Sequence, residues 1–246
     1  MLCEPIIAGD WEEYDDGGDE TAIIDSGHPL SVYHLDTILR DPDTYADRPA
    51  SRIFGAEETA ELISAHLLGT VAQEPGHIIK QGGVFTNYAH RTLQRLKKEE
   101  DSGILHPEAI SIYRELSDVE KKSVDEIVTE AAERMEGFPN IGKMNVVFTN
   151  ENVSVDVGPT MLEMLIPAVV ETRKGLAAVV PTITGILQGE TTYATAGAAE
   201  HIMGSIRGAD ISQVHLWDIG ASRVRRIPLG DLDEAVATIA RMCRNK

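Results

Sequence analysis

The sequence predicts a mixed α/β fold, and three observations support this prediction. Residues 56–136 carry apolar side chains at helical spacing, so the N-terminal half is expected to be rich in helices. From residue 144 onward, short apolar runs alternate with Gly- and Asn-containing turns and helical patterns. The resulting order ββαβαββα implies a mixed C-terminal sheet with helices packed on it. A chain of 246 residues that is 42% hydrophobic and 25% charged is long enough to bury a sizeable core.

Helices are predicted in the first half over residues 56–72, 86–98, 107–116 and 117–136. The last is the clearest, because Ser117 and Glu120 form a capping box at its start and Gly137 follows its end. Its expected buried stripe consists of Val124, Ile127, Val128, Ala131 and Met135. Residues 138–142 are the best boundary between an acidic N-terminal region, 1–138, and an α/β region, 139–246. One continuous domain is the alternative.

In the second half, strands 144–149 and 153–157 are predicted to form a hairpin around Asn150–Asn152. A helix over 160–174 is expected to end at Gly175, followed by a buried strand over 176–180. A second hairpin is predicted from residues 212–219 and 222–228 around Gly220 and Ala221. Ala-rich and amphipathic patterns predict further helices over 191–207 and 231–244.

Charge is distributed unevenly along the chain. The whole chain carries −18, residues 1–60 carry −12, and residues 201–246 carry +2. This acidity argues against nucleic acid and anionic membranes as partners. No apolar stretch of 18 residues occurs, and the first residues lack the features of a signal peptide. Cys3 and Cys243 lie at opposite ends, and a reduced state is the simpler reading, so we expect a soluble, cytoplasmic, acidic protein.

Two turns are candidate anion sites. Gly158 and Thr160 lie where a predicted strand leads into a predicted helix, and free N–H groups at a helix start can bind phosphate. The alternative is an ordinary helix cap. Thr182, Thr184 and Gly185 follow the buried strand 176–180, which is where open α/β sheets bind ligands. They can equally be the exit of a strand.

The second predicted hairpin carries basic residues. Arg223 and Arg225 share one face of their strand, while Arg226 falls on the other. With His215 and Trp217 on the partner strand, they could form a face that binds a planar anion such as a nucleotide. A solvated face, or pairing with acidic residues of the first 60, is the alternative.

A metal site is a further hypothesis. Asp25, His28, His34 and Asp36 are residue types that bind Zn, Mn or Fe, but their spacing matches no metal-binding signature.

The favoured hypothesis is a small-molecule enzyme, a transferase acting on an anionic substrate that carries a phosphate or nucleotide. Group transfer is favoured because it can depend on positioning and electrostatics alone. The sequence indicates no particular cofactor. The alternatives are a metal-dependent hydrolase using the Asp/His cluster, and a non-catalytic assembly module in which acidic and Arg-bearing regions of two copies pair. A homo-oligomer is expected.

Overall fold

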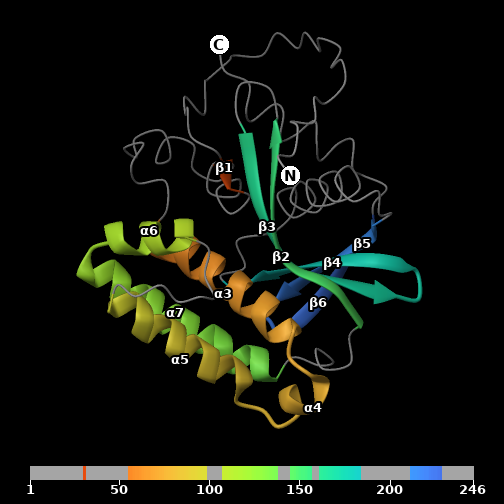
Figure 1. Ribbon diagram of the computed structural model, residues 1–246, viewed down its shortest axis with the longest axis horizontal. Helices are drawn as coiled ribbons and strands as arrows, with labels where there is room; N and C mark the ends of the chain where they lie inside the picture. Colours follow the sequence, from red (N-terminus) through yellow and green to blue (C-terminus); the bar gives the residue numbers. More distant parts are fainter. Residues whose placement is uncertain are drawn as a thin grey trace, which may run out of the picture.

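The computed structural model describes residues 30–31, 55–98, 107–137, 145–156, 161–183 and 211–228. Within these ranges the fold is mixed α/β, as predicted, with helices packed on a mixed sheet of six strands (Figure 1). Among the described helices, none combines the length and apolar character that a bilayer crossing requires.

The described helices are α3 (Ala56–Ala72), α4 (Gly76–Ile79), α5 (Val84–Lys97), α6 (Pro107–Glu115) and α7 (Asp118–Glu136). The four longer ones match the predicted helices to within about two residues at each end. Ser117 caps α7 as predicted: its hydroxyl accepts from the amide of Glu120, whose carboxylate accepts from the amide of Ser117 at 2.8 Å. Gly137 ends α7 in right-handed backbone geometry.

The strands are β1 (Leu30–Ser31), β2 (Asn145–Asp156), β3 (Met161–Thr172), β4 (Gly175–Thr182), β5 (Ile211–Asp218) and β6 (Arg223–Pro228). The sheet order is β1-β3-β4-β5-β6, and β2 pairs with β3 along its other edge. β4 and β5 are parallel, as are β1 and β3, whereas the other pairs are antiparallel. Strand β4 and the hairpin of β5 and β6 were predicted.

The predicted helix over 160–174 is wrong: these residues form strand β3. Residues 165–170 are buried without a break, so both faces of the strand are covered. A continuous apolar run of this kind fits a buried strand or a buried helix equally well by periodicity. Gly175, expected to end a helix, instead begins β4 with φ 113°. The predicted order ββαβαββα therefore fails at its first helix.

The predicted hairpin around Asn150 is also wrong. Residues 145–156 form the single strand β2, which pairs with β3 from Asn145↔Glu171 to Asp156↔Met161. Asn150 keeps the left-handed backbone typical of turns, with φ 51°, but within the strand. Long-range pairing with β3 outweighs the local turn preference.

Several predicted elements lie outside the described residues. These are the boundary segment 138–142 and the helices over 191–207 and 231–244.

Helix α3 occupies the centre of the core. It contacts β2, β3 and β4 on one side and α5, α6 and α7 on the other. Thirteen of its residues are buried, including the polar residues Glu58, Glu61 and His66. The core unites these helices with side chains on one sheet face, among them Val179 and Trp217. The opposite sheet face is buried as well, at Val180, Val214 and Leu216.

Gly69 allows α3 to approach the sheet closely. A Cβ atom at this position would lie 2.1 Å from Oδ1 of Asn150 and 2.5 Å from the carbonyl oxygen of Pro167. Thr70 and Gln73, on the same end of α3, are hydrogen-bonded to the side chains of Asn150 and Thr149. The small residue thus sets the distance between helix and sheet.

Gly69→Ala is expected to lower the free energy of unfolding by about 1–3 kcal/mol, the usual cost of overpacking. Urea denaturation measures this change. The control is Gly137→Ala, where the added Cβ would lie 3.5 Å from its nearest neighbour, the carbonyl oxygen of Arg134. That variant should keep or slightly raise stability. Equal stability of Gly69→Ala and wild type would contradict the close approach.

Candidate functional site

Of the residues predicted to bind a ligand, Thr182, His215, Arg223 and Arg225 are among the described residues. Gly158, Thr160, Thr184 and Gly185 lie outside them, as do the proposed metal ligands Asp25, His28, His34 and Asp36. The roles of these residues stay predictions. Within the described residues, no group of three or more His, Cys, Asp or Glu side chains could hold a metal ion.

Thr182 and Asp218 lie side by side at the carboxyl ends of the parallel strands β4 and β5. The amide of Ile219 donates to the carbonyl oxygen of Thr182 at 2.8 Å. Above this edge, Glu61 of α3 is 1% exposed. Its carboxylate accepts from the amide of Ile183 at 2.8 and 3.0 Å and from the hydroxyl of Thr182 at 3.2 Å. The buried carboxylate thus ends β4 and ties it to α3.

Asp218 connects this edge to the basic hairpin. It is 4% exposed, and its carboxylate accepts from the amide of Ala221 at 2.9 Å and from Nε of Arg223 at 3.0 Å. Arg134 of α7 donates to the carbonyl oxygen of Gly220 in the same turn at 2.8 Å. We call Glu61, Thr182, Asp218 and Arg223 the strand-end cluster. It brings together two residues that the sequence singled out separately, Thr182 and Arg223.

The members of the strand-end cluster differ in access to solvent. Thr182 is fully buried and its hydroxyl is engaged by Glu61. The side chain of Arg223 is 57% exposed. The remaining N–H groups of Arg223 are therefore accessible to a ligand, whereas the buried Thr182 only holds β4 against α3 through Glu61.

The predicted face of Arg223, Arg225, His215 and Trp217 does not form. Strand register pairs His215 with Arg226 and Trp217 with Val224, while Arg225 pairs with Leu216. Directly paired residues share a sheet face, so His215 lies with Arg226 and opposite to Arg223 and Arg225. The register of β5 against β6 depends on the geometry of the turn at residues 219–222. The alternation of side chains in the sequence does not predict that geometry.

His215 is buried beside a cation. Burial lowers the pKa of its imidazole, and the positive charge of Arg226 lowers that pKa further. Its Nε2 has no hydrogen-bond partner within the described residues. His215 is accordingly a neutral side chain at physiological pH.

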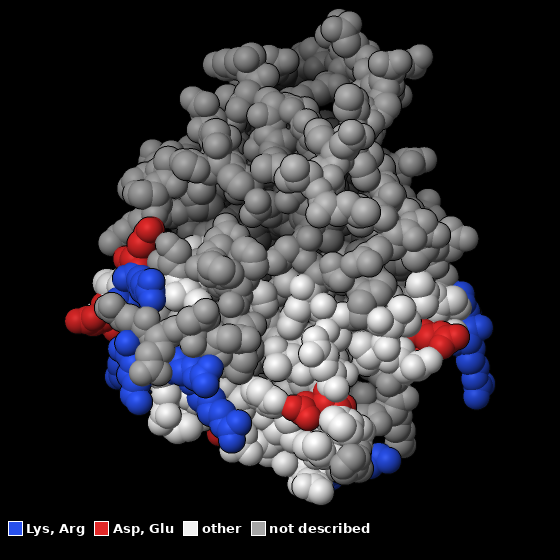
Figure 2. Space-filling view, viewed as in Figure 1, with Lys and Arg blue, Asp and Glu red and all other residues white. Residues whose placement is uncertain are grey.

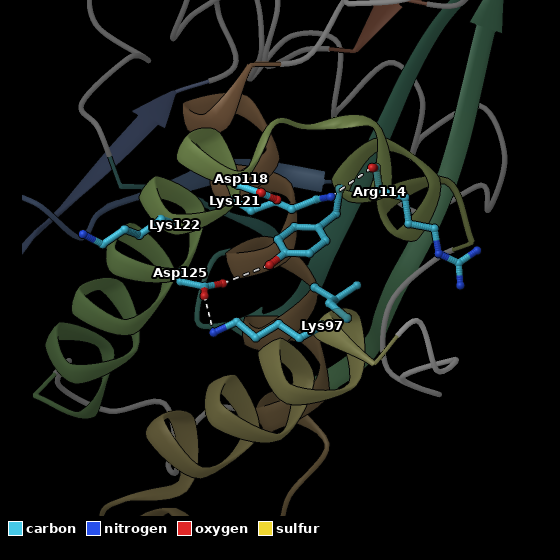
Figure 3. A pocket seen from close by; sticks show the side chains of 8 residues that line it. Lys97, Arg114, Asp118, Lys121, Lys122 and Asp125 are labelled. Atoms are coloured by element: carbon cyan, nitrogen blue, oxygen red, sulfur yellow. Dashed lines mark hydrogen bonds and ion pairs between the residues drawn. The ribbon is translucent and has the colours of Figure 1, made fainter.

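A second candidate site, which sequence reasoning missed, lies among α5, α6 and α7 (Figure 3). This pocket of about 430 Å³, called the helix pocket, lies within the size range of small-molecule sites. Four basic and two acidic side chains line it. The lining residues are Leu96, Lys97, Tyr113, Arg114, Asp118, Lys121, Lys122 and Asp125.

Hydrogen bonds and ion pairs hold the walls of the helix pocket. The hydroxyl of Tyr113 donates to Asp125 at 3.2 Å, and Asp125 also pairs with Lys97. Lys121 donates to the carbonyl oxygen of Arg114 at 3.1 Å, and its Nζ lies 5.9 Å from the centre of the Tyr113 ring. Burial, and then the charge and hydrogen bond of Asp125, raise the pKa of the Tyr113 hydroxyl, whose proton is donated to Asp125.

The pocket is positively charged because its cations outnumber its anions. Within the described residues, Lys121 makes no ion pair, and Lys122 makes one at 3.7 Å to Glu126, with both side chains exposed. Such an exposed pair neutralises little charge. Figure 2 shows Lys and Arg side chains gathered over α5, α6 and α7. The sequence offered two signals near this pocket, Lys97 at a helix end and the capping box at Ser117. Each is explained by the end of its own helix, so neither predicted the pocket.

Comparison with known proteins leaves the family open: no family model matches the chain, and no curated protein matches it.

Glu61→Gln is expected to lower the free energy of unfolding by about 1–3 kcal/mol, because the amide loses charge-assisted hydrogen bonds in a buried site. Chemical denaturation monitored by circular dichroism measures the difference. Glu133→Gln, an exposed change of the same kind on α7, should stay within about 0.5 kcal/mol of wild type. Similar losses for both variants would show that Glu61 does not link α3 to β4.

His215 is expected to make stability depend on pH. Its pKa is lower in the folded state, so the unfolded chain binds the proton first as pH falls below about 6.5. The free energy of unfolding should therefore decrease toward acid, and less so in His215→Gln. Arg226→Gln should also weaken the dependence by removing one cause of the shift. Denaturation series across this pH range test the prediction, and identical profiles for wild type and His215→Gln would contradict it.

Proposed function

We propose that the protein binds a small anionic molecule, one that carries a phosphate group, in the helix pocket. The observation that supports this proposal is the excess of basic side chains around a pocket of about 430 Å³ in a chain whose net charge is −18. Ammonium and guanidinium groups form the strongest hydrogen bonds to phosphate oxygens. In an acidic protein, such a local excess of cations favours an anionic ligand.

The walls of the pocket suit this ligand in two ways. Lys121 offers a charge that makes no ion pair within the described residues. Lys97 is already oriented by Asp125, so its position costs little entropy when a ligand binds. Tyr113 is 2% exposed and its hydroxyl donates to Asp125, so it holds the pocket wall and does not itself bind the ligand.

Group transfer on a phosphate- or nucleotide-bearing substrate is the reaction class that we propose for this ligand. Fixed cations around a phosphate stabilise the charge that develops during transfer, without a covalent intermediate on the protein. Arg223 of the strand-end cluster is held by Asp218. That cluster lies at the C-terminal end of α7, where Arg134 donates to Gly220, and is separate from the helix pocket at the N-terminal end of α7.

Lys121→Gln is the variant that tests the helix pocket. Isothermal titration with pyrophosphate and with adenosine triphosphate measures affinity, and circular dichroism checks that the variant is folded. Loss of one charged hydrogen bond of about 1.5–3 kcal/mol should weaken binding about tenfold or more. Lys174→Gln, the same change in the exposed turn between β3 and β4, is the matched control and should bind as wild type does.

Two results would contradict the proposal. One is the absence of binding by either phosphate compound at concentrations up to about 1 mM, the upper end of typical KM values for enzyme substrates. The other is equal weakening by Lys121→Gln and Lys174→Gln, which would show that only overall charge matters.

A further inference from the structure

The two carboxylates that line the helix pocket differ in what they contact. Asp125 pairs with Lys97 and accepts a hydrogen bond from the hydroxyl of Tyr113, so it is part of the pocket wall. The side chain of Asp118 lines the same pocket but makes no hydrogen bond and no ion pair within the described residues. The pocket therefore presents one carboxylate that is free to contact a ligand.

Asp118 is not needed to cap the helix to which it belongs. Helix α7 is capped by Ser117 and Glu120, whose side chains each accept from the backbone amide of the other residue. Asp118 is exposed in the first turn, where a negative charge interacts favourably with the helix dipole. A role limited to the dipole would affect stability but not the binding of a ligand.

The position of Asp118 opposes the direct binding of a phosphate group. Asp118 precedes Lys121 and Lys122 by three and four positions, so the three side chains extend from neighbouring points on α7. Figure 3 shows Asp118 beside Lys121 at one end of the pocket. A phosphate bound by these lysines would lie near the carboxylate, and like charges repel. A divalent cation between the carboxylate and the phosphate removes this repulsion, because it attracts both anions.

We propose that the ligand of the helix pocket binds as its magnesium complex, with Asp118 as the carboxylate that binds the metal ion. This proposal rests on the proposed function and names the substrate class, a compound with two or more linked phosphates such as a nucleoside diphosphate or triphosphate. Linked phosphates hold Mg²⁺ between their oxygens. The ion then needs only one or two carboxylates from a protein. Lys121 and Lys122 would bind the remaining phosphate oxygens.

The structure also indicates the order in which the metal is held. Within the described residues, no group of three or more His, Cys, Asp or Glu side chains could hold an ion without other ligands. Mg²⁺ keeps several water molecules and is bound weakly by a single carboxylate. The metal ion is therefore expected to enter the pocket together with the phosphates.

Isothermal titration of the full chain with adenosine triphosphate tests the proposal, once with excess Mg²⁺ and once with a chelator, at the same ionic strength. For wild type, Mg²⁺ should tighten binding about tenfold or more, the effect of one charge-assisted contact. For Asp118→Asn, this gain should disappear. The metal-free ligand should bind this variant more tightly than it binds wild type, because the repelling charge is gone. Circular dichroism checks that the variant is folded.

Glu115→Gln is the matched control. Glu115 is exposed at the end of α6, three positions before Asp118, and is not part of the pocket lining. The variant also removes one negative charge near the pocket, so it should retain the full effect of Mg²⁺ on affinity. Titration with Mg²⁺ alone should show no binding at concentrations where the complex with adenosine triphosphate binds.

The possible results distinguish this proposal from the proposed function. Adenosine triphosphate that binds equally well with and without Mg²⁺ would overturn the magnesium site and leave the anion pocket in place. So would an equal effect of Mg²⁺ on wild type and Asp118→Asn, which would leave Asp118 only its interaction with the helix dipole. No binding under either condition would contradict the proposed function and the magnesium site together.

Discussion

The buried carboxylate of Glu61 determines how the helices sit on the sheet. A carboxylate that is 1% exposed is costly to bury unless hydrogen bonds replace its water. The amide of Ile183 and the hydroxyl of Thr182 provide them, at distances of 2.8 to 3.2 Å. These two donors lie where β4 ends, so their hydrogen bonds to Glu61 hold α3 at that edge. Helices α5 and α7 pack on the far side of α3, and the helix pocket therefore depends on the same contact.

A second contact completes the placement of α3. Near its other end, Gly69 lies directly against Asn150 and Pro167, in the part of the sheet where β2 and β3 pair. One contact is polar and directional, whereas the other is steric, and the two are separated by eight positions along the helix. Two separated contacts fix the axis of a helix as well as its position.

Local sequence signals predicted the helices, whereas the strands of the sheet were determined by pairing between residues far apart in the sequence. The capping box at Ser117 and the bounds of α3 were predictable because caps and periodicity act within a few residues. Strand β3 was not, because its apolar run fits two structures and only pairing with β2 and β4 selects one. Thr182 and Arg223 were each predicted to bind a ligand, and that role stays a prediction; the strand register that brings both next to Asp218 could not be predicted. The helix pocket draws on three helices, and no local pattern records their relative placement.

Net charge and local charge act over different distances, which makes an acidic chain compatible with the anionic ligand that we propose. At physiological ionic strength, charges on the surface interact over about 8 Å. A phosphate in the helix pocket would therefore respond to Lys97, Arg114, Lys121 and Lys122 more than to acidic residues elsewhere. The overall charge still slows the approach of an anion, because steering acts before contact. Added salt should weaken the attraction to the pocket cations and also the repulsion by the net negative charge. These two changes oppose each other, so the affinity should depend less strongly on salt than it would in a protein that is basic throughout.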